Sequence, residues 1–152
     1  MDEIELKNFI FEASRATYAS GDESLKHKEG DGSTTIVYEK GGYKMHDNYF
    51  GGEPYCGREV IFLENKAIWM MVYYGLVYEG VVHADVYKFL MSALSNNTNE
   101  MPYRGPTLYE KDNWRYENSF VGDVSNLSGT EKIFKDNLCV YEASYLGGFV
   151  DR

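Results

Sequence analysis

The two halves of the sequence correspond to each other, and this is the feature that most restricts how the chain can fold. Two ungapped blocks of the first half, 38–52 and 57–75, align with 109–123 and 129–147 of the second. The blocks share 11 identities in 34 positions. Unrelated segments of that length share about two identities at average residue usage. We therefore predict an internal duplication, which decides the fold before any single element does.

Segments of a different period precede each block. Asp2, with Glu5 three positions later, resembles a helix-capping box. Apolar residues then recur at helical spacing in both halves, 80 positions apart: Leu6, Phe9, Ile10 and Ala13, then Val86, Phe89, Leu90 and Ala93. This pattern predicts two amphipathic helices.

Each half reads as one helix followed by four strands. Gly41-Gly42 and Asp112-Asn113 are typical of the first hairpin turn in each half, and Glu64-Asn65 and Asp136-Asn137 of the last. The predicted fold class is α+β, with two tandem α-β4 repeats at about 3–78 and 83–149 within a single domain spanning 1–152. One helix packs on one face of an antiparallel sheet in each repeat, and the sheets are either separate or joined into one curved sheet. The polar segment 19–33 is expected to be a mobile loop.

Charge and hydropathy exclude several partners. The chain has 15 Lys and Arg against 24 Asp and Glu, for a net charge of −9. Nucleic acids are bound mainly through basic side chains, so we expect no direct nucleic-acid binding. The longest apolar run, Ala67–Tyr78, has 12 residues, and a membrane-spanning helix needs about 20. With no secretory signal pattern at the start, we expect a cytoplasmic protein that does not associate with membranes.

The sequence has no familiar catalytic, phosphate-binding or dinucleotide-binding motif. His27, His46 and His83 share no ligand spacing. Cys56 and Cys139 belong to no CxxC pair and are expected to be inert, reduced thiols. We therefore expect no metal and no cofactor.

Polar side chains occur among aromatic residues on the predicted inner face of the strands. Alternation places Asp47 on the same face as Tyr43 and Tyr49, and Asn118 takes the equivalent position in the second half. A carboxylate among aromatic rings must be paired or neutralised. Tyrosine hydroxyls and backbone amides satisfy such groups structurally, or the groups line a pocket that holds a small polar or cationic ligand. The candidate ligand-binding residues are Asp47, Glu59, Trp69, Tyr73, Arg104, Tyr116, Asn118, Glu131 and Tyr145.

Arg104 lies in the stiff segment Pro102–Pro106 and has two interpretations. Its guanidinium could hold an anionic ligand through its fork of donors. The more conservative interpretation is that Arg104 ties the loop to a carboxylate or to helix-end carbonyls.

The strand that ends the first half has an apolar outer face formed by Met70, Val72 and Tyr74. The second half carries Glu142 and Ser144 at the positions of Met70 and Val72. An apolar strip of this size usually marks an interface. We therefore expect these three residues to contact a protein partner, such as a second copy in a homodimer.

Five stretches rich in Tyr, Trp and Gly carry a family resemblance: YFGGE at 49–53, GREV at 57–60, WMMVYYG at 69–75, YRGP at 103–106 and YLGG at 145–148. Together they resemble an uncharacterised bacterial domain family, found alone or C-terminal to Cro/repressor-type (XRE-like) helix-turn-helix regulators. The resemblance implies a cytoplasmic bacterial protein linked to regulation or sensing. It supplies no catalytic residue.

The sequence thus favours a small-ligand-binding or sensory domain. The alternative is a protein-interaction or inhibitor-like module, since the predicted architecture also resembles the tandem-repeat β-lactamase inhibitor proteins. An enzyme using Asp47 or Glu59 for acid–base work is the least favoured function, because the sequence identifies no pair of groups with separated pKa values.

Overall fold

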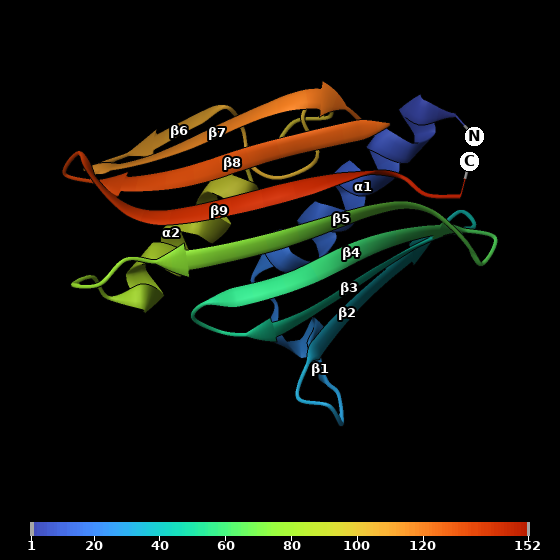
Figure 1. The fold of residues 1–152 in the computed structure, drawn as a ribbon, viewed down its shortest axis with the longest axis horizontal. Coiled ribbons are helices and arrows are strands. Elements are labelled where there is room, and N and C mark those ends of the chain that lie inside the picture. Colours follow the sequence, from blue (N-terminus) through green and yellow to red (C-terminus); the bar gives the residue numbers. More distant parts are fainter. Residues whose placement is uncertain (1, 152) are drawn as a thin grey trace.

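A computed structural model describes residues 2–151, and strands dominate it. Nine strands form one antiparallel sheet in the order β1-β2-β3-β4-β5-β9-β8-β7-β6 (Figure 1). The helical elements are α1 (Glu3–Ala16), η1 (Tyr18–Ser20), η2 (Glu23–Leu25) and α2 (His83–Leu94), η1 and η2 being short 3-10 helices. The strands are β1 (His27–Lys28), β2 (Thr34–Lys40), β3 (Tyr43–Gly51), β4 (Tyr55–Leu63), β5 (Lys66–Val77), β6 (Leu108–Lys111), β7 (Trp114–Asp123), β8 (Asn126–Lys135) and β9 (Leu138–Phe149).

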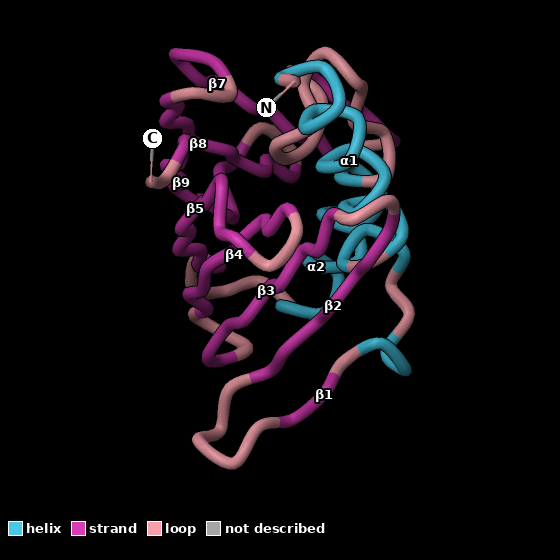
Figure 2. Tube along the Cα trace, turned by 90° about the vertical axis from the view of Figure 1, so that its right-hand side faces the viewer, coloured by secondary structure: helices cyan, strands magenta, loops and turns pink. Residues whose placement is uncertain are grey.

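Both long helices lie on the same side of the sheet, and the other side is left without helices (Figure 2). The predicted helices are confirmed. The Asp2 carboxylate caps α1 by accepting hydrogen bonds from the backbone N–H groups of Ile4 and Glu5, at 2.8 and 3.4 Å. The eight apolar residues of the two helical stripes are buried, as an amphipathic helix on a sheet requires.

The hairpin turns also occur where the sequence indicates. Glu64 and Asn65 have φ values of 48° and 67°, and Asp136 and Asn137 have φ values of 51° and 64°. Paired positive φ values of this kind match the right-handed twist of the flanking strands. The inner face of β3 is confirmed as well, since Met45 and Asp47 are buried beneath the helices.

The predicted fold class, an α+β arrangement of two tandem α-β4 repeats, is wrong. The molecule is a β-rich structure built on one sheet, because β5 and β9 pair antiparallel from Trp69–Phe149 to Val77–Tyr141. These are the two longest strands, at 12 residues each. Each would otherwise expose a row of unpaired backbone groups, which proteins avoid.

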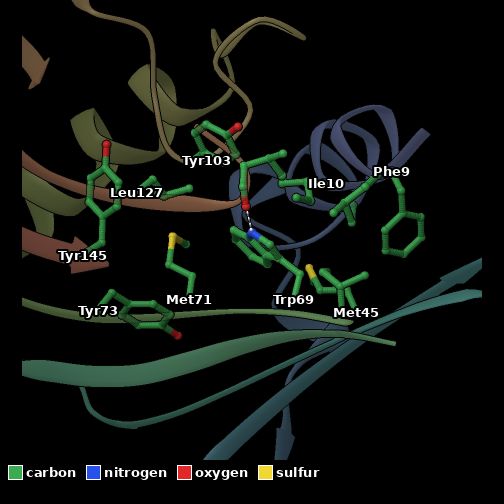
Figure 3. Close-up of a cluster of buried hydrophobic side chains, with 13 residues drawn as sticks. Phe9, Ile10, Met45, Trp69, Met71, Tyr73, Tyr103, Leu127 and Tyr145 are labelled. Atoms are coloured by element: carbon green, nitrogen blue, oxygen red, sulfur yellow. Dashed lines mark hydrogen bonds between the residues drawn. The ribbon is translucent and has the colours of Figure 1, made fainter. Parts of the chain in front are cut away.

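The core is also shared between the two halves of the chain. Leu6 and Ile10 of α1 pack in one cluster with Val124 and Leu127, which lie around the β7–β8 turn. Figure 3 shows this cluster around Trp69, whose indole nitrogen donates to the Val124 carbonyl at 2.9 Å. Each half therefore has its own core cluster, and each cluster is completed by side chains from the other half.

The segment expected to be a mobile loop contains regular structure. It holds η2 and β1, and β1 adds a ninth strand by pairing with β2 through His27–Thr35 and Lys28–Thr34. Within residues 2–151, no helix is both long and apolar enough to cross a membrane.

Candidate functional site

A cavity of about 470 Å³ lies between the inner face of the sheet, η1 and α2. Three ionisable side chains at its buried end, Asp47, Glu59 and Arg104, are 3%, 1% and 6% exposed. The remaining lining residues are tyrosines, apolar side chains and a polar rim: Tyr18, Tyr49, Tyr55, Tyr73, Tyr87, Ile36, Leu90, Met91, Leu94, Gly21, Gly52, Glu23, Lys26 and Lys88.

The two acids are brought together by strand register. Asp47 of β3 lies directly opposite Glu59 of β4, and Glu59 lies opposite Met71 of β5. Directly opposed residues share a face, with Cβ atoms about 5 Å apart. The sheet therefore presents two carboxyl groups side by side to the cavity.

Asp47 has one hydrogen-bond partner in the cavity wall. The Tyr73 hydroxyl donates to its Oδ1 at 2.5 Å. Burial raises the pKa of Asp47 to about 6, against the opposing effects of the Tyr73 hydrogen bond and the Arg104 charge. Asp47 is mostly ionised at neutral pH.

Glu59 differs because its Oε1 atom is buried and makes no hydrogen bond with any of residues 2–151. Burial, and next the negative charge of Asp47, raise the pKa of Glu59 to about 8, although Arg104 acts in the opposite direction. Glu59 is thus mostly protonated at neutral pH. A buried polar atom without a partner costs about 1–3 kcal/mol, and a ligand that supplied the partner would recover that free energy.

Arg104 is held by a third acid beside the cavity. Its Nε and Nη2 atoms donate to Glu131 Oε1 at 3.0 and 2.5 Å. The hydroxyls of Tyr116 and Tyr141 also donate to Glu131, at 2.5 and 3.0 Å. Glu131 is therefore fully bonded, whereas Glu59, its equivalent in the sequence alignment, is not.

Asn118 belongs to the same network and fixes the segment that carries Arg104. Its Nδ2 donates to the Gly105 carbonyl at 2.9 Å, and its Oδ1 accepts from the Tyr145 hydroxyl at 2.7 Å. The Gly105 N–H donates to the Tyr116 hydroxyl at 3.0 Å. These bonds hold Arg104 in place without a ligand.

The structure separates the predicted ligand-binding residues into three groups. Asp47, Glu59, Tyr73 and Arg104 line the cavity. Trp69 lies away from it, in the core cluster between Met45 and Met71 in the view of Figure 3. The other four predicted residues, Tyr116, Asn118, Glu131 and Tyr145, form the network beside the cavity and do not line it.

Three cavity tyrosines were missed from the sequence. Tyr55 has the same strand parity as Glu59, which could have identified it, and its hydroxyl lies 2.5 Å from that of Tyr141. Tyr87 of α2 donates to Glu53, whose other oxygen accepts from the Val77 N–H at 2.7 Å. No sequence pattern signals this contact, which ties the β3–β4 hairpin to α2 at the cavity. Nor does any pattern signal Tyr18, which follows α1.

The predicted interface residues lie on the opposite side of the sheet, away from the helices. Met70 and Val72 are half-buried, and Tyr74 is 49% exposed. Leu146 of β9 lies opposite Val72 and is 60% exposed. The apolar surface thus continues from β5 onto β9.

Metal-binding residues do not gather at the cavity. Across residues 2–151 there is no cluster of three or more His, Cys, Asp or Glu side chains with metal-binding geometry.

Comparison with known proteins identifies the family and no activity. Neither the curated proteins nor the solved structures include a significant match to the chain. Residues 47–150 match the family described as "Domain of unknown function (DUF5680)". The matched range runs from β3 to the end of β9 and contains all nine predicted ligand-binding residues. The chain belongs to this family of domains of unknown function.

Proposed function

We propose that this protein is a sensory domain that binds a small polar molecule in the cavity between the sheet, η1 and α2. The observation that carries the proposal is the buried Glu59 Oε1 atom, which has no hydrogen-bond partner in residues 2–151 and lies in the cavity wall beside Asp47. Buried polar atoms are nearly always bonded, so an unpartnered one in a cavity marks a place for a ligand donor.

The cavity has the usual character of a small-molecule site. Its volume of about 470 Å³ lies within the range of about 300–1,000 Å³ typical of ligand pockets. Ile36, Leu90, Met91 and Leu94 supply an apolar wall, and a few polar groups converge at the buried end. A ligand there would touch both η1 and α2, which gives binding a route to the surface and to any attached domain.

The acid pair also bears on catalysis. Asp47 and Glu59 have pKa values of about 6 and about 8, a separation that the sequence did not reveal and that acid–base enzymes use. A bound small molecule is required in either case. Binding is therefore the function that the cavity supports best.

A thermal-shift screen against a metabolite collection tests the proposal. We expect at least one compound to raise the Tm of the wild type by about 5–10 °C at 100 times its Kd, the shift expected from about 2.7 kcal/mol in a domain of this size. Met91→Trp fills the cavity and should abolish that shift, because Met91 lines the cavity from α2. Met70→Trp, on the other side of the sheet, should retain it. Equal shifts in both variants, or no shift with any compound, would contradict binding in this cavity.

A second candidate function is protein interaction through the outer face of β5 and β9. The exposed Tyr74 and Leu146, with Val72 between them, form an apolar surface at the middle of the sheet. Such positions are usually polar on a sheet face that contacts water.

A further inference from the structure

The two acidic side chains at the buried end of the cavity have no basic partner in the described part of the chain, and this imbalance limits which ligands the cavity can bind. Asp47 and Glu59 are neighbours at the buried end, and no Lys, Arg or His among residues 2–151 forms an ion pair with either acid. Two carboxyl groups this close ionise together only when a cation is near. No described cation is therefore paired directly with the two acids, although the Arg104 charge acts on both of them from the cavity wall.

The chain's own cations are engaged or distant from the buried end. Arg104 is committed to Glu131, with an Nη2–Oε1 distance of 2.5 Å. Lys26 pairs with Glu23 at 2.7 Å. Lys88 is exposed at the rim of the cavity. Arg104 and Glu131 cancel, which leaves the buried end with the negative charge of Asp47.

The walls suit a positive charge that carries an organic group. Tyr18 and Tyr73 already hold the Arg104 guanidinium, whose Cζ lies 5.8 Å from the centre of each ring. Tyr55 adds a third ring, 6.0 Å from Tyr73 between centroids. Aromatic faces of this kind attract organic cations more strongly once water is excluded.

Apart from the proton that Glu59 holds at neutral pH, the hydrogen-bonding atoms of the acid pair are acceptors. The Tyr73 hydroxyl already donates to Asp47, which leaves Glu59 Oε1 as the atom in need of a donor. An anion would meet the charge of Asp47 at close range. A hard metal ion would find two carboxyl groups where calcium takes six to eight oxygen ligands.

We infer that the ligand of this cavity is a compact organic cation whose protonated nitrogen donates hydrogen bonds to Glu59 and Asp47 among the rings of Tyr18, Tyr55 and Tyr73. This inference rests on the proposed function and names the ligand class of the same site. When the cation binds at neutral pH, the Glu59 carboxyl loses its proton to solvent and the resulting carboxylate pairs with the ligand.

Three matched probes test the ligand class: benzylammonium, its neutral counterpart benzyl alcohol, and its anionic counterpart benzoate. Titration calorimetry should show benzylammonium binding about tenfold tighter than either, as expected for charge-assisted hydrogen bonds. Carbon-13 NMR of the carboxyl groups should show the Glu59 resonance moving with benzylammonium alone. Affinity should rise with pH through about 8 as Glu59 ionises among Asp47, Arg104, Tyr18 and Tyr73, the charged and titratable groups that face it.

Two variants test whether the preference for benzylammonium comes from the acid pair or from the overall negative charge of the protein. Glu59→Gln keeps the shape of a protonated glutamate and should lose the tenfold preference for benzylammonium. Glu79→Gln removes a charge from an exposed position outside the cavity and should leave the preference unchanged. Tight binding of benzyl alcohol or benzoate would overturn the cation class and leave the cavity as a binding site. If none of the three probes binds, the inference that the ligand is a cation is also overturned. The proposed function would still be tested separately, by whether Met91→Trp abolishes the thermal shift caused by metabolite hits.

Discussion

At the scale of single residues, the acid pair makes the protein's stability depend on pH. The pKa of Glu59 is raised from 4.5 to about 8 in the folded chain, and that of Asp47 from 3.8 to about 6. Between the unfolded and folded pKa values, the folded state holds a proton that the unfolded state releases. The free energy of unfolding therefore falls as pH rises through this window.

Glu59→Gln should remove most of that dependence. We expect the free energy of unfolding of the wild type to drop by about 1–3 kcal/mol more than that of the variant between pH 5 and 8. Urea unfolding at several pH values measures the difference. Glu79→Gln, with an exposed side chain, should keep the wild-type slope. Parallel curves for wild type and Glu59→Gln would show that Glu59 is not held protonated.

At the scale of elements, β4 allows β5 to place Tyr73 against Asp47. Gly57 of β4 lies opposite Tyr73 and Tyr49. A Cβ atom at Gly57 would lie 2.6 Å from both the Tyr73 hydroxyl oxygen and the Asn48 carbonyl oxygen. Because the Asn48 atom belongs to the backbone, the strands could not accommodate the methyl group without shifting.

Gly57→Ala should therefore destabilise the protein by about 1–3 kcal/mol, the usual cost of overpacking. It should also move the Tyr73 hydroxyl away from Asp47 and raise the pKa of Asp47, since that hydrogen bond lowers it. Urea unfolding and a carboxyl NMR titration measure the two effects. Gly52→Ala is the matched control, because no atom lies within 4 Å of its Cβ position. An unchanged Asp47 titration in Gly57→Ala would contradict this role of Gly57.

At the scale of the whole molecule, the single sheet has one side covered by helices and one side without them (Figure 2). β5 and β9 occupy its middle, so their outer residues lie far from either edge. A partner placed there would cover Val72, Tyr74 and Leu146 together. In a homodimer, a second copy of the chain would cover these three residues with its own copies of the same residues.

Light scattering tests this whole-molecule prediction. We expect the wild type to be a dimer at micromolar concentration and Val72→Asp to be a monomer, because a charge at the centre of an apolar interface would be buried without a partner. Ile4→Asp, at a 70% exposed position of α1, should leave the mass unchanged. A monomeric wild type would rule out the homodimer.

Much of the local structure was predictable from the sequence. The helical stripes, the Asp2 cap and the Asn65 and Asn137 turns follow from patterns that span a few residues. Strand alternation correctly placed Asp47 on the covered face for the same reason, since successive side chains point to opposite sides. Asp47, Glu59 and Tyr73 consequently line the cavity, and the loop residue Arg104 joins them there.

Only the tertiary structure decided which distant segments meet. The pairing of β5 with β9 made one β-rich sheet of what the sequence presented as two α-β4 units. Long-range contacts likewise bonded Glu131 fully to Arg104 and left Glu59 without a partner, although the sequence aligns the two glutamates. Periodicity in the sequence indicates which face of an element a residue occupies, because that depends on its neighbours in the chain. The residue that it contacts across the molecule depends on how the strands of the whole sheet pair, which no local pattern indicates.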